Sequence, residues 1–450
     1  MRTTAPPRLR RHLHFDALIL LARRAFDKLP EPRRCPSFTL ADTLMAGLAL
    51  FSLKDPSLLA FQHRTLDHNL RAVFGLQAIP SDTQMRTILD GVDPDHLRPV
   101  FRDVFRQLQR GKVLEDYLFL EGCYLLALDG VEYFRSDKVH CEHCLSCQHH
   151  DGVVSYYHQM LGAALVHPDF PEVIPLAPEP IQRADGQAKN DCERNAARRW
   201  LLRFRQDHPH LPLIVTEDAL SSNAPHIRDL LKHRIHFILG VKEGDHQHLF
   251  AQYQQGLETG QVQGVHEEDV PGGISRSWLF VNGLGLNESS PEVLVNLLVF
   301  VEVDAAGKVH SWAWVTDLTL RADNVRPVAR GGRTRWRIEN ETFNTLKNQG
   351  YHFEHNYGHG EQHLAVVFAS LMMLAFLIDQ VQQKCNPLFR KAWERKGPKC
   401  ALWEAVRYLF AAFEVSSMAE IYQGIAFGFK RPALSTLIDQ GPVGNRSDTS

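Results

Sequence analysis

The order of apolar strands and amphipathic helices between residues 121 and 240 restricts the fold more than any other feature of the chain. Three short apolar runs come first, followed by a helix, a strand, a second helix and another strand. The first helix carries Asp191 and Glu193 in its first turn, where acids suit the helix dipole. Continuous apolar strands between helices indicate an α/β sheet covered by helices. The predicted strands are 124–128, 160–166, 173–176, 213–216 and 235–239, and the predicted helices are about 189–207 and 224–233.

Changes in sequence pattern divide the rest of the chain around this core. Residues before about 120 read as short helices, and Ser81 with Gln84 three residues later has the pattern of a capping box. The stretch from 241 to 320 is β-rich and rich in Gly near its start, which predicts an insertion with exposed loops. The predicted order is a helical N-terminal domain that we expect to bind DNA (1–120), the first part of the core (121–240), the β-rich insertion (241–320), the rest of the core (321–384), a C-terminal helical region (385–436) and a disordered tail (437–450).

Composition and charge bound the function. The 450 residues carry a net charge of −2, but residues 1–34 hold nine basic against three acidic residues, and residues 326–350 hold six against two. Such basic islands can neutralise phosphates, although solvent exposure explains the N-terminal island equally well. The longest apolar run, 364–378, is shorter than the roughly 20 residues of a membrane span, which predicts a buried helix and no membrane. We expect no secretory signal, and eight mostly scattered cysteines fit a reducing cytoplasm.

An acidic side chain lies on the apolar face of the helix predicted at 333–350. Glu339 falls in the middle of the apolar stripe at about 100° per residue. A carboxylate that faces the core needs a partner, because an unpaired charge is costly to bury. The partner is either Arg335, one helical turn earlier, or a metal ion. The stripe consists of Trp336, Phe343 and Leu346, with Glu341 on the opposite face.

Two aspartates follow apolar strands where ligands collect in α/β sheets. Asp129 follows the strand at 124–128, and Asp218 follows the strand at 213–216. Each acid taken alone is better explained as a turn or capping residue. Together with Glu339 they form a set of carboxylates that suits a hard cation such as Mg²⁺ or Mn²⁺. Two such ions can support an in-line displacement at phosphorus, which is a mechanism for cutting and joining DNA.

The sequence RWRIENETFNTLK resembles the third-acid motif of DDE transposases from bacterial insertion sequences, in the branch marked by a Tyr, Arg, Glu and Lys signature. LALDG and LIVTED occupy the places of the two aspartates. The resemblance covers residues 121–384 and implies an α/β fold with a ribonuclease H-like mixed-sheet core, in which a β-rich insertion precedes the glutamate helix. Two positions depart from the signature. Gly332 replaces the tyrosine, and Lys347 lies eight residues after Glu339, one more than usual, so either the branch is divergent or Lys347 has another role.

The resemblance implies a transposase that binds the terminal inverted repeats of an insertion sequence and catalyses metal-dependent cleavage and strand transfer. Asp129, Asp218 and Glu339 would be catalytic and would bind two Mg²⁺ or Mn²⁺ ions. The partners would be double-stranded DNA at the transposon ends and at the target, and pairing of two ends implies a homodimer. Two alternatives remain, which are a metal-dependent nuclease without transfer and a catalytically inactive DNA-binding descendant.

The same resemblance implies a set of DNA contacts around the glutamate helix. Trp312 and Trp314 lie two residues apart in the insertion, and so on one face of a strand. Related enzymes stack a flipped base on an aromatic there, whereas core packing is the simpler explanation for at least one of the two. The predicted phosphate contacts are Arg335 and Lys347, and Arg330, Arg333 and Arg337 extend the basic surface.

A cysteine cluster follows Asp129 closely. Cys141, Cys144 and Cys147 form two overlapping C-x-x-C spacings, which together with His149 predict a tetrahedral zinc site, and His150 or His158 can replace His149. The alternative is a set of reduced loop cysteines, since no second distant pair completes the usual arrangement. The histidines of YHFEHNYGHGEQH at 351–363 are not expected to bind metal, because histidines after a helix more often cap it or bind phosphate.

Overall fold

A mixed sheet forms the centre of the computed structural model, which describes residues 10–63, 68–183, 191–270 and 273–428. Among these residues the strands pair in the order β2-β3-β1-β6-β7-β11-β10-β9-β8, and β4 and β5 also pair with β3. The chain is therefore a mixed α/β protein, as its sequence predicts. The strands are β1 (Tyr124–Ser136), β2 (Leu145–Gln148), β3 (Val154–His167), β4 (Phe170–Pro175), β5 (Glu179–Ile181), β6 (Leu213–Glu217), β7 (His236–Gly240), β8 (Gln263–Val270), β9 (Ile274–Gly285), β10 (Leu294–Val303) and β11 (Val309–Thr316).

The central strands of the sheet are parallel, and their neighbours on one side are antiparallel. β1, β6 and β7 pair in parallel, whereas β3 is antiparallel to β1 and β4 is antiparallel to β3. β6 is buried along its whole length, because parallel strands are covered on both faces. The five strands predicted from the sequence correspond, in chain order, to β1, β3, β4, β6 and β7.

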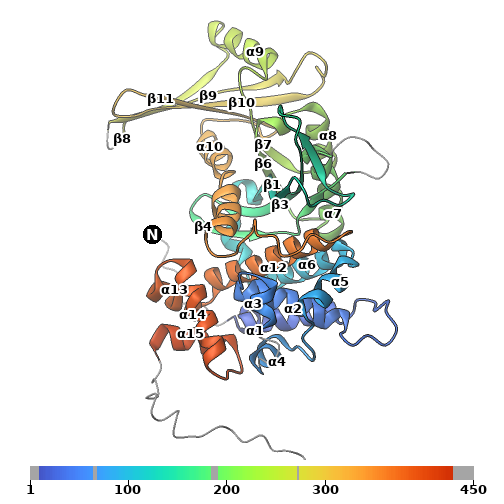
Figure 1. The fold of residues 1–450 in the computed structure, drawn as a ribbon. Coiled ribbons are helices and arrows are strands. Elements are labelled where there is room, and N and C mark those ends of the chain that lie inside the picture. Colours follow the sequence, from blue (N-terminus) through green and yellow to red (C-terminus); the bar gives the residue numbers. More distant parts are fainter. Residues whose placement is uncertain (1–9, 64–67, 184–190, 271–272, 429–450) are drawn as a thin grey trace, which may run out of the picture.

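Helices cover both faces of these central strands. α7 (Glu193–Asp207) packs on β1, β3 and β5, and α8 (Ala224–Lys232) packs beside α7 and on β7. α10 (Val325–Thr334) packs on β6 and β7 and lies on the other side of the sheet from α7 and α8 (Figure 1). The two helices predicted after the third strand are α7 and α8.

The segment from 241 to 320 extends the central sheet. After α9 (Gln247–Glu258), strands β8 to β11 pair in antiparallel order, and β11 joins β7 with Trp314 opposite Gly240. These strands form a long arm that projects from the core at the top of Figure 1. The chain leaves the arm through β11 and enters α10, which precedes Glu339.

Helices from both ends of the chain pack together below the sheet (Figure 1). α12 (Leu364–Cys385) lies between β4 and the helices α2, α5 and α6, and the capping box predicted at Ser81 and Gln84 begins α5. We call these helices the helical bundle. Its other helices are α1 (Phe15–Phe26), α2 (Leu40–Leu53), α3 (Leu58–Gln62), α4 (His68–Phe74), α5 (Asp82–Asp90), α6 (Arg98–Arg110), α13 (Pro387–Lys396), α14 (Lys399–Ala412) and α15 (Met418–Phe427).

α12 is the central helix of this bundle. It is buried along nearly its whole length, which confirms the buried helix predicted at 364–378. Within the described part of the chain it is also the one helix that is long and apolar enough to cross a membrane. Because 94% of its most apolar window is buried inside the molecule, its apolar character is consistent with the core helix of a soluble protein.

A buried ion pair inside the bundle joins its N-terminal helices to its C-terminal helices. The ammonium group of Lys54, just after α2, contacts the carboxylate of Asp379 on α12, and both side chains are almost fully buried. The hydroxyl of Tyr351 donates a hydrogen bond to the same carboxylate (2.8 Å). The ammonium also lies 3.9 Å from the ring centroid of Trp403, which gives the buried charge a second favourable contact.

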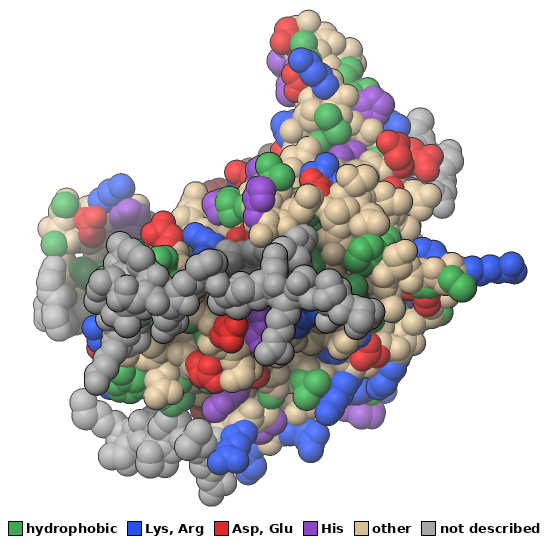
Figure 2. All heavy atoms as spheres, turned by 60° about the horizontal axis from the view of Figure 1, so that its bottom comes forward, with side chains coloured by type: hydrophobic (Ala, Val, Ile, Leu, Met, Phe, Trp, Pro, Cys, Tyr) green, Lys and Arg blue, Asp and Glu red, His purple; other side chains and the backbone are tan. Residues whose placement is uncertain are grey.

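Charged side chains are unevenly distributed over the end of the molecule formed by the bundle. Lys and Arg side chains gather along the lower right margin of this face, and acidic side chains are scattered over the rest (Figure 2). DNA binding by residues 1–120 stays a prediction. The tail predicted to be disordered, 437–450, lies outside the described residues.

Candidate functional site

Asp129 and Asp218 are brought side by side by the register of two parallel strands. Ala127 of β1 pairs with Thr216 of β6, so each aspartate lies two residues beyond the same pair. Asp218 follows β6 and caps the short helix η5 (Ala219–Ser221), accepting a hydrogen bond from the backbone N–H of Leu220 (3.0 Å). The two acids therefore lie at the same level of the sheet, but the prediction that Asp129 follows its strand was wrong, because β1 continues to Ser136 and Asp129 pairs with Gly162 of β3.

Arg335 connects this pair to Glu339. Its guanidinium group lies 3.3 Å from the carboxylate of Asp129 and 2.7 Å from that of Glu339. Its charge also interacts with Asp218. Of the two partners that the sequence left open for Glu339, the structure shows the arginine. We call Asp129, Asp218, Glu339 and Arg335 the acidic site.

Burial raises the pKa of Asp129 to about 7. The positive charge of Arg335 opposes this shift, while the negative charges of Glu339 and Glu193 add to it. Asp129 therefore holds its proton to a much higher pH than an ordinary aspartate does. Perturbed carboxylates of this kind gather at functional sites more often than elsewhere, because catalysis needs groups that titrate near neutral pH.

Glu193 is a further acid beside this site, and no functional role was predicted for it from the sequence. It begins α7 and accepts a hydrogen bond from the side-chain amide of Gln159 on β3 (2.8 Å). Burial raises its pKa, and so does the negative charge of Asp218. Gly130 makes room for it, since a Cβ there would lie 2.0 Å from the Glu193 carboxylate. The position of Glu193 in the first turn of a helix next to the strands could have indicated a site residue, but the helix dipole alone was a sufficient explanation for an acid there.

The helix predicted at 333–350 is interrupted. α10 ends at Thr334, a π-helix η6 spans Ile338–Phe343, and α11 covers Asn344–Asn348. Two members of the predicted apolar stripe are buried, but Trp336 is 58% exposed and the Glu339 side chain is 45% exposed, so the stripe was wrong for Trp336 and Glu339 does not face the core. The physical reason is that the regular helix ends before Trp336 and the chain turns before the π-helix begins. π-turns of this kind often occur at functional sites.

An aromatic and basic pocket lies next to Arg335. It has a volume of about 380 Å³. Trp314 is buried and packs on Gly332, where a Cβ would lie 2.4 Å from the indole nitrogen, so core packing accounts for Trp314. Trp312 carries the guanidinium group of Arg333 over its ring at 4.6 Å. The lining residues are Trp312, Trp314, Gly332, Arg333, Arg335 and Trp336, and we call this the tryptophan pocket.

Of the five basic side chains predicted to contact DNA, two lie beside the acidic site and three do not. Arg333 and Arg335 line the tryptophan pocket beside the acidic site, whereas the other three basic side chains already have partners away from it. These partners are the Asp169 carboxylate for Arg330, the Pro168 carbonyl for Arg337 (3.1 Å) and the Glu354 carboxylate for Lys347 (2.7 Å).

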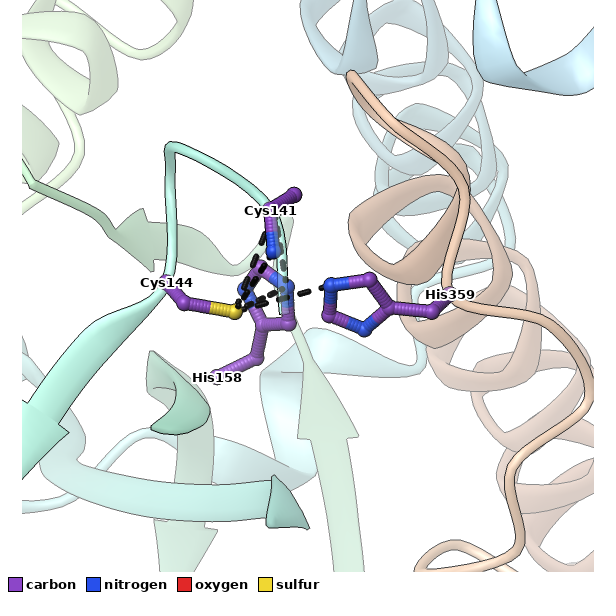
Figure 3. A group of neighbouring side chains, drawn as sticks. All are labelled: Cys141, Cys144, His158 and His359. Atoms are coloured by element: carbon purple, nitrogen blue, oxygen red, sulfur yellow. Dashed lines mark hydrogen bonds between the residues drawn. The ribbon is translucent and has the colours of Figure 1, made fainter. Parts of the chain in front are cut away.

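A second site is formed by two cysteines and two histidines. Cys141 and Cys144 lie in the loop before β2, His158 lies on β3, and His359 comes from the segment before α12 (Figure 3). Their ligand atoms all lie within 4.8 Å of one another, and the four residues can bind a metal such as zinc. We call them the Cys/His cluster. The pKa of the Cys141 thiol is lowered because the Cys144 thiol and the imidazole of His158 hydrogen bond to its thiolate.

This arrangement corrects the predicted zinc ligands in three places. Cys147 is exposed on β2 and takes no part. His149 hydrogen bonds to the hydroxyl of Ser155 (2.8 Å). Its place is taken by His158, which was an alternative, and the fourth position by His359, in a segment where no metal ligand was expected. The physical reason is the tertiary fold, which leaves Cys147 exposed on the edge strand β2 and brings His359 to the loop that holds Cys141 and Cys144.

The carboxylates of the acidic site do not converge as closely as the Cys/His cluster does. Within the described residues, the Cys/His cluster is the group of three or more potential ligands that is close enough to share an ion. The structure thus does not support the predicted Mg²⁺ or Mn²⁺ ligands as a preformed set. The guanidinium group of Arg335 contacts two of them, Asp129 and Glu339.

No protein-family model and no curated protein matches the chain. The function therefore rests on the geometry of these two sites and on the resemblance of the motif around Glu339.

Proposed function

We propose that the protein is a DDE-class transposase that binds the terminal inverted repeats of an insertion sequence and cuts and joins DNA there. One observation carries the proposal. Asp129 and Asp218 lie at one level of neighbouring parallel strands, and Arg335 ties Glu339 to them. Three acids from three separate parts of the chain thus lie around one basic side chain, which contacts Asp129 and Glu339 and interacts through its charge with Asp218.

The topology of the sheet supports a ribonuclease H-like core. The strands pair in the order β4-β3-β1-β6-β7, with β1, β6 and β7 parallel and β3 antiparallel to β1. This order fits the ribonuclease H-like core that the resemblance of the sequence implies. Strands β8 to β11 enter between β7 and α10, so a β-rich insertion precedes the glutamate segment as in the branch that the motif resembles.

Local structure gives a physical reason for both departures from the signature. A π-turn holds one more residue than an α-turn, so the π-helix between Glu339 and Lys347 absorbs the extra residue in their spacing. Gly332 replaces the signature tyrosine because the indole of Trp314 already fills the space where its side chain would begin. Both departures then belong to a divergent member of the branch.

The acids fit the chemistry that the proposal needs. Three carboxylates are the oxygen ligands that Mg²⁺ or Mn²⁺ prefers, and two such ions, when bound, would activate the attacking oxygen and stabilise the leaving oxygen. A water oxygen then bonds to phosphorus at the element end, and the 3′-oxygen leaves and takes up a proton. In the second step this 3′-hydroxyl bonds to a phosphorus of the target, whose own 3′-oxygen leaves.

Arg335 has a second role in this proposal. It now neutralises Asp129 and Glu339, and a phosphodiester offers its planar guanidinium group the same bidentate contact. With its acidic partners neutralised in another way, Arg335 would be free to hold the phosphate of the transposon end, with Arg333 beside it in the tryptophan pocket. Lys347 would exchange Glu354 for a phosphate in the same way.

The tryptophan pocket supports a role for stacking in this chemistry. Trp336 is exposed, so its ring can receive an unpaired base next to the reacting phosphate, whereas Trp312 is only partly exposed and already stacks on Phe300 and Arg333. Trp314 forms the buried wall of the pocket.

Pairing of two transposon ends implies a homodimer on DNA. A protein that acts on the chromosomal DNA of its host cell works in the cytoplasm of a bacterium.

Strand chemistry on a duplex that carries the sequences flanking the coding region tests the proposal. We expect nicking and joining with Mg²⁺ or Mn²⁺, and loss of both in Asp129→Asn and Glu339→Gln while DNA binding remains. Glu341→Gln is the matched control, since Glu341 lies on the same helical segment but pairs with Arg337 (3.7 Å).

Other outcomes separate the alternatives. Cleavage without joining to a target indicates a nuclease. DNA binding with no divalent-dependent chemistry in the intact protein contradicts both enzyme functions and leaves an inactive DNA-binding descendant. Activity that survives in Asp129→Asn contradicts the proposed site.

A further inference from the structure

We propose that the Cys/His cluster is a structural Zn²⁺ centre that fastens the segment 351–363 to the edge of the central sheet. The Cys/His cluster has thiol and imidazole ligands, whereas the acidic site has carboxylates, and the assignment of zinc does not depend on the transposase function. It stands on the distances between the four ligand atoms, on their burial and on the parts of the chain that they join.

The distances match those of a tetrahedral zinc ion. Bonds of about 2.3 Å to sulfur and about 2.0–2.1 Å to nitrogen place two sulfurs about 3.8 Å apart and a sulfur and a nitrogen about 3.5–3.6 Å apart. The two Sγ atoms of Cys141 and Cys144 are 3.8 Å apart. Nε2 of His158 lies 3.6 Å and 3.5 Å from these two atoms, and Nε2 of His359 lies 3.5 Å from Cys144. Four of the six edges of the tetrahedron are therefore present.

The charges of the ligands suit a buried zinc ion. Two thiolates balance the two charges of Zn²⁺, and two neutral imidazoles add none, so the loaded centre is electrically neutral. Neutrality matters because all four residues are buried, with exposed fractions of 9% or less. Two thiolates and two imidazoles also favour zinc over the oxygen-loving Mg²⁺.

Aromatic rings enclose the cluster. The ring of Tyr133 stacks on His158 with centroids 5.9 Å apart, and the ring of Phe134 lies 4.6 Å from that of His359. Nδ1 of His359 has no partner among the described residues, so the contact with Phe134 helps to set the orientation of this ring. Four protein ligands and an apolar shell leave no open position, which is typical of a structural zinc site.

The centre would join parts of the chain that are far apart in sequence. His359 lies 215 residues after Cys144. Figure 3 shows its segment approaching from the helix side while the other three ligands come from the sheet and its loop. A metal clip that closes so long a loop restricts the unfolded chain strongly. It would therefore stabilise the fold and hold the segment before α12 against the sheet.

The segment with His359 is already fixed to the helical bundle on its other side. The carboxylate of Asp90, at the end of α5, accepts hydrogen bonds from four successive backbone N–H groups at the start of α12, each 3.0 Å long. The hydroxyl of Tyr357 donates a hydrogen bond to the carbonyl of Asp55 (2.9 Å). The zinc centre would add the link to the sheet, so that the segment bridges sheet and bundle. The four N–H groups are those of Glu361, Gln362, His363 and Leu364.

Metal analysis of the purified full-length protein tests the assignment. We expect one zinc per chain in the wild type and less than a tenth of that in Cys144→Ser and His359→Ala. Cys147→Ser is the matched control, since this neighbouring cysteine is exposed, and we expect it to keep its zinc. Cobalt added to the metal-free protein should give the strong visible absorption of a tetrahedral thiolate site.

A second measurement covers variants that fail to fold. Treatment of the wild type and of Cys147→Ser with a chelator should lower the melting temperature of both equally, and zinc alone should restore it. Hydrogen exchange should rise in residues 351–363 and 140–148 before it rises in β6. Iron in place of zinc, full zinc in Cys144→Ser, or an intact mass that shows a Cys141–Cys144 disulfide would each overturn the proposal, as would a melting temperature that the chelator leaves unchanged.

Discussion

The guanidinium group of Arg335 lies 3.3 Å from the carboxylate of Asp129, although 206 residues separate the two in the chain. The same group contacts Glu339 at 2.7 Å. One arginine thus offsets the repulsion of acids that come from a strand and from a π-helix. It also holds these two carboxylates near each other.

Replacing Arg335 should expose this repulsion. We expect Arg335→Ala to lower the free energy of unfolding at pH 8 by about 1–3 kcal/mol, because hydrogen bonds to charged groups contribute about that much. Mn²⁺ should raise the melting temperature of the variant more than that of the wild type, since the cation takes over the role of the arginine. Urea and thermal unfolding with and without Mn²⁺ measure both effects. Arg337→Ala is the control, because Arg337 contacts Glu341 and the Pro168 carbonyl instead.

The raised pKa of Asp129 predicts that divalent-cation binding at the acidic site depends on pH. A cation binds the ionised carboxylate, so binding must displace the proton that Asp129 holds below a pKa of about 7. We expect the apparent affinity for Mn²⁺ to fall about tenfold per pH unit below 7 and to level off above it. Calorimetric titration in two buffers of different ionisation enthalpy measures the released proton. An affinity that does not change between pH 5.5 and 8 would contradict the assignment.

Glu193→Gln should move this pH dependence. The negative charge of Glu193 helps to raise the pKa of Asp129, so removing it lowers that pKa. The midpoint of the Mn²⁺ titration should therefore shift to lower pH, while the hydrogen bond to Gln159 can be kept by the amide. The same calorimetric series measures the shift. A midpoint that moves to higher pH would show that Glu193 binds the cation itself.

Gly332 should not tolerate the tyrosine of the signature that the motif around Glu339 resembles. A Cβ at this position would lie 2.4 Å from the indole nitrogen of Trp314, so we expect Gly332→Ala to cost about 1–3 kcal/mol of stability through overpacking. The cost should fall to a fraction of that in a Trp314→Ala background, where the space is free. A double-mutant cycle by urea unfolding measures the coupling. Additive effects of the two substitutions would rule out the proposed contact.

Breaking the buried ion pair between Lys54 and Asp379 should destabilise the helical bundle strongly. Removal of one partner leaves an uncompensated buried charge, and we expect Lys54→Met or Asp379→Asn to cost about 3–5 kcal/mol. The double variant Lys54→Met with Asp379→Leu should recover much of this loss, since no buried charge remains. Urea unfolding of the three variants tests this. A double variant that is less stable than either single one would contradict the explanation.

Part of the fold could be predicted because it depends on neighbouring residues. The apolar run of β6 and the capping box at Ser81 report on conformations that a few adjacent residues set. The same is true of α12, whose apolar length alone indicated a buried helix. The position of Asp218 after its strand also followed from the local pattern. The strand that ends before Asp129 in the sequence pattern continues to Ser136 in the structure, because pairing with β3 extends β1 past the apolar run.

The tertiary structure alone decided which distant residues meet. Trp336 lost its predicted place in the core because the helix breaks after Thr334, and no periodicity signals a π-turn. Glu193 and His359 joined their sites through contacts between separate elements of the fold, which sequence spacing does not encode. The sequence by itself determined the strands, the helices and the types of ligand available. Packing and strand register, which depend on the whole chain, decided that Arg335 bridges the acids and that His359 completes the Cys/His cluster.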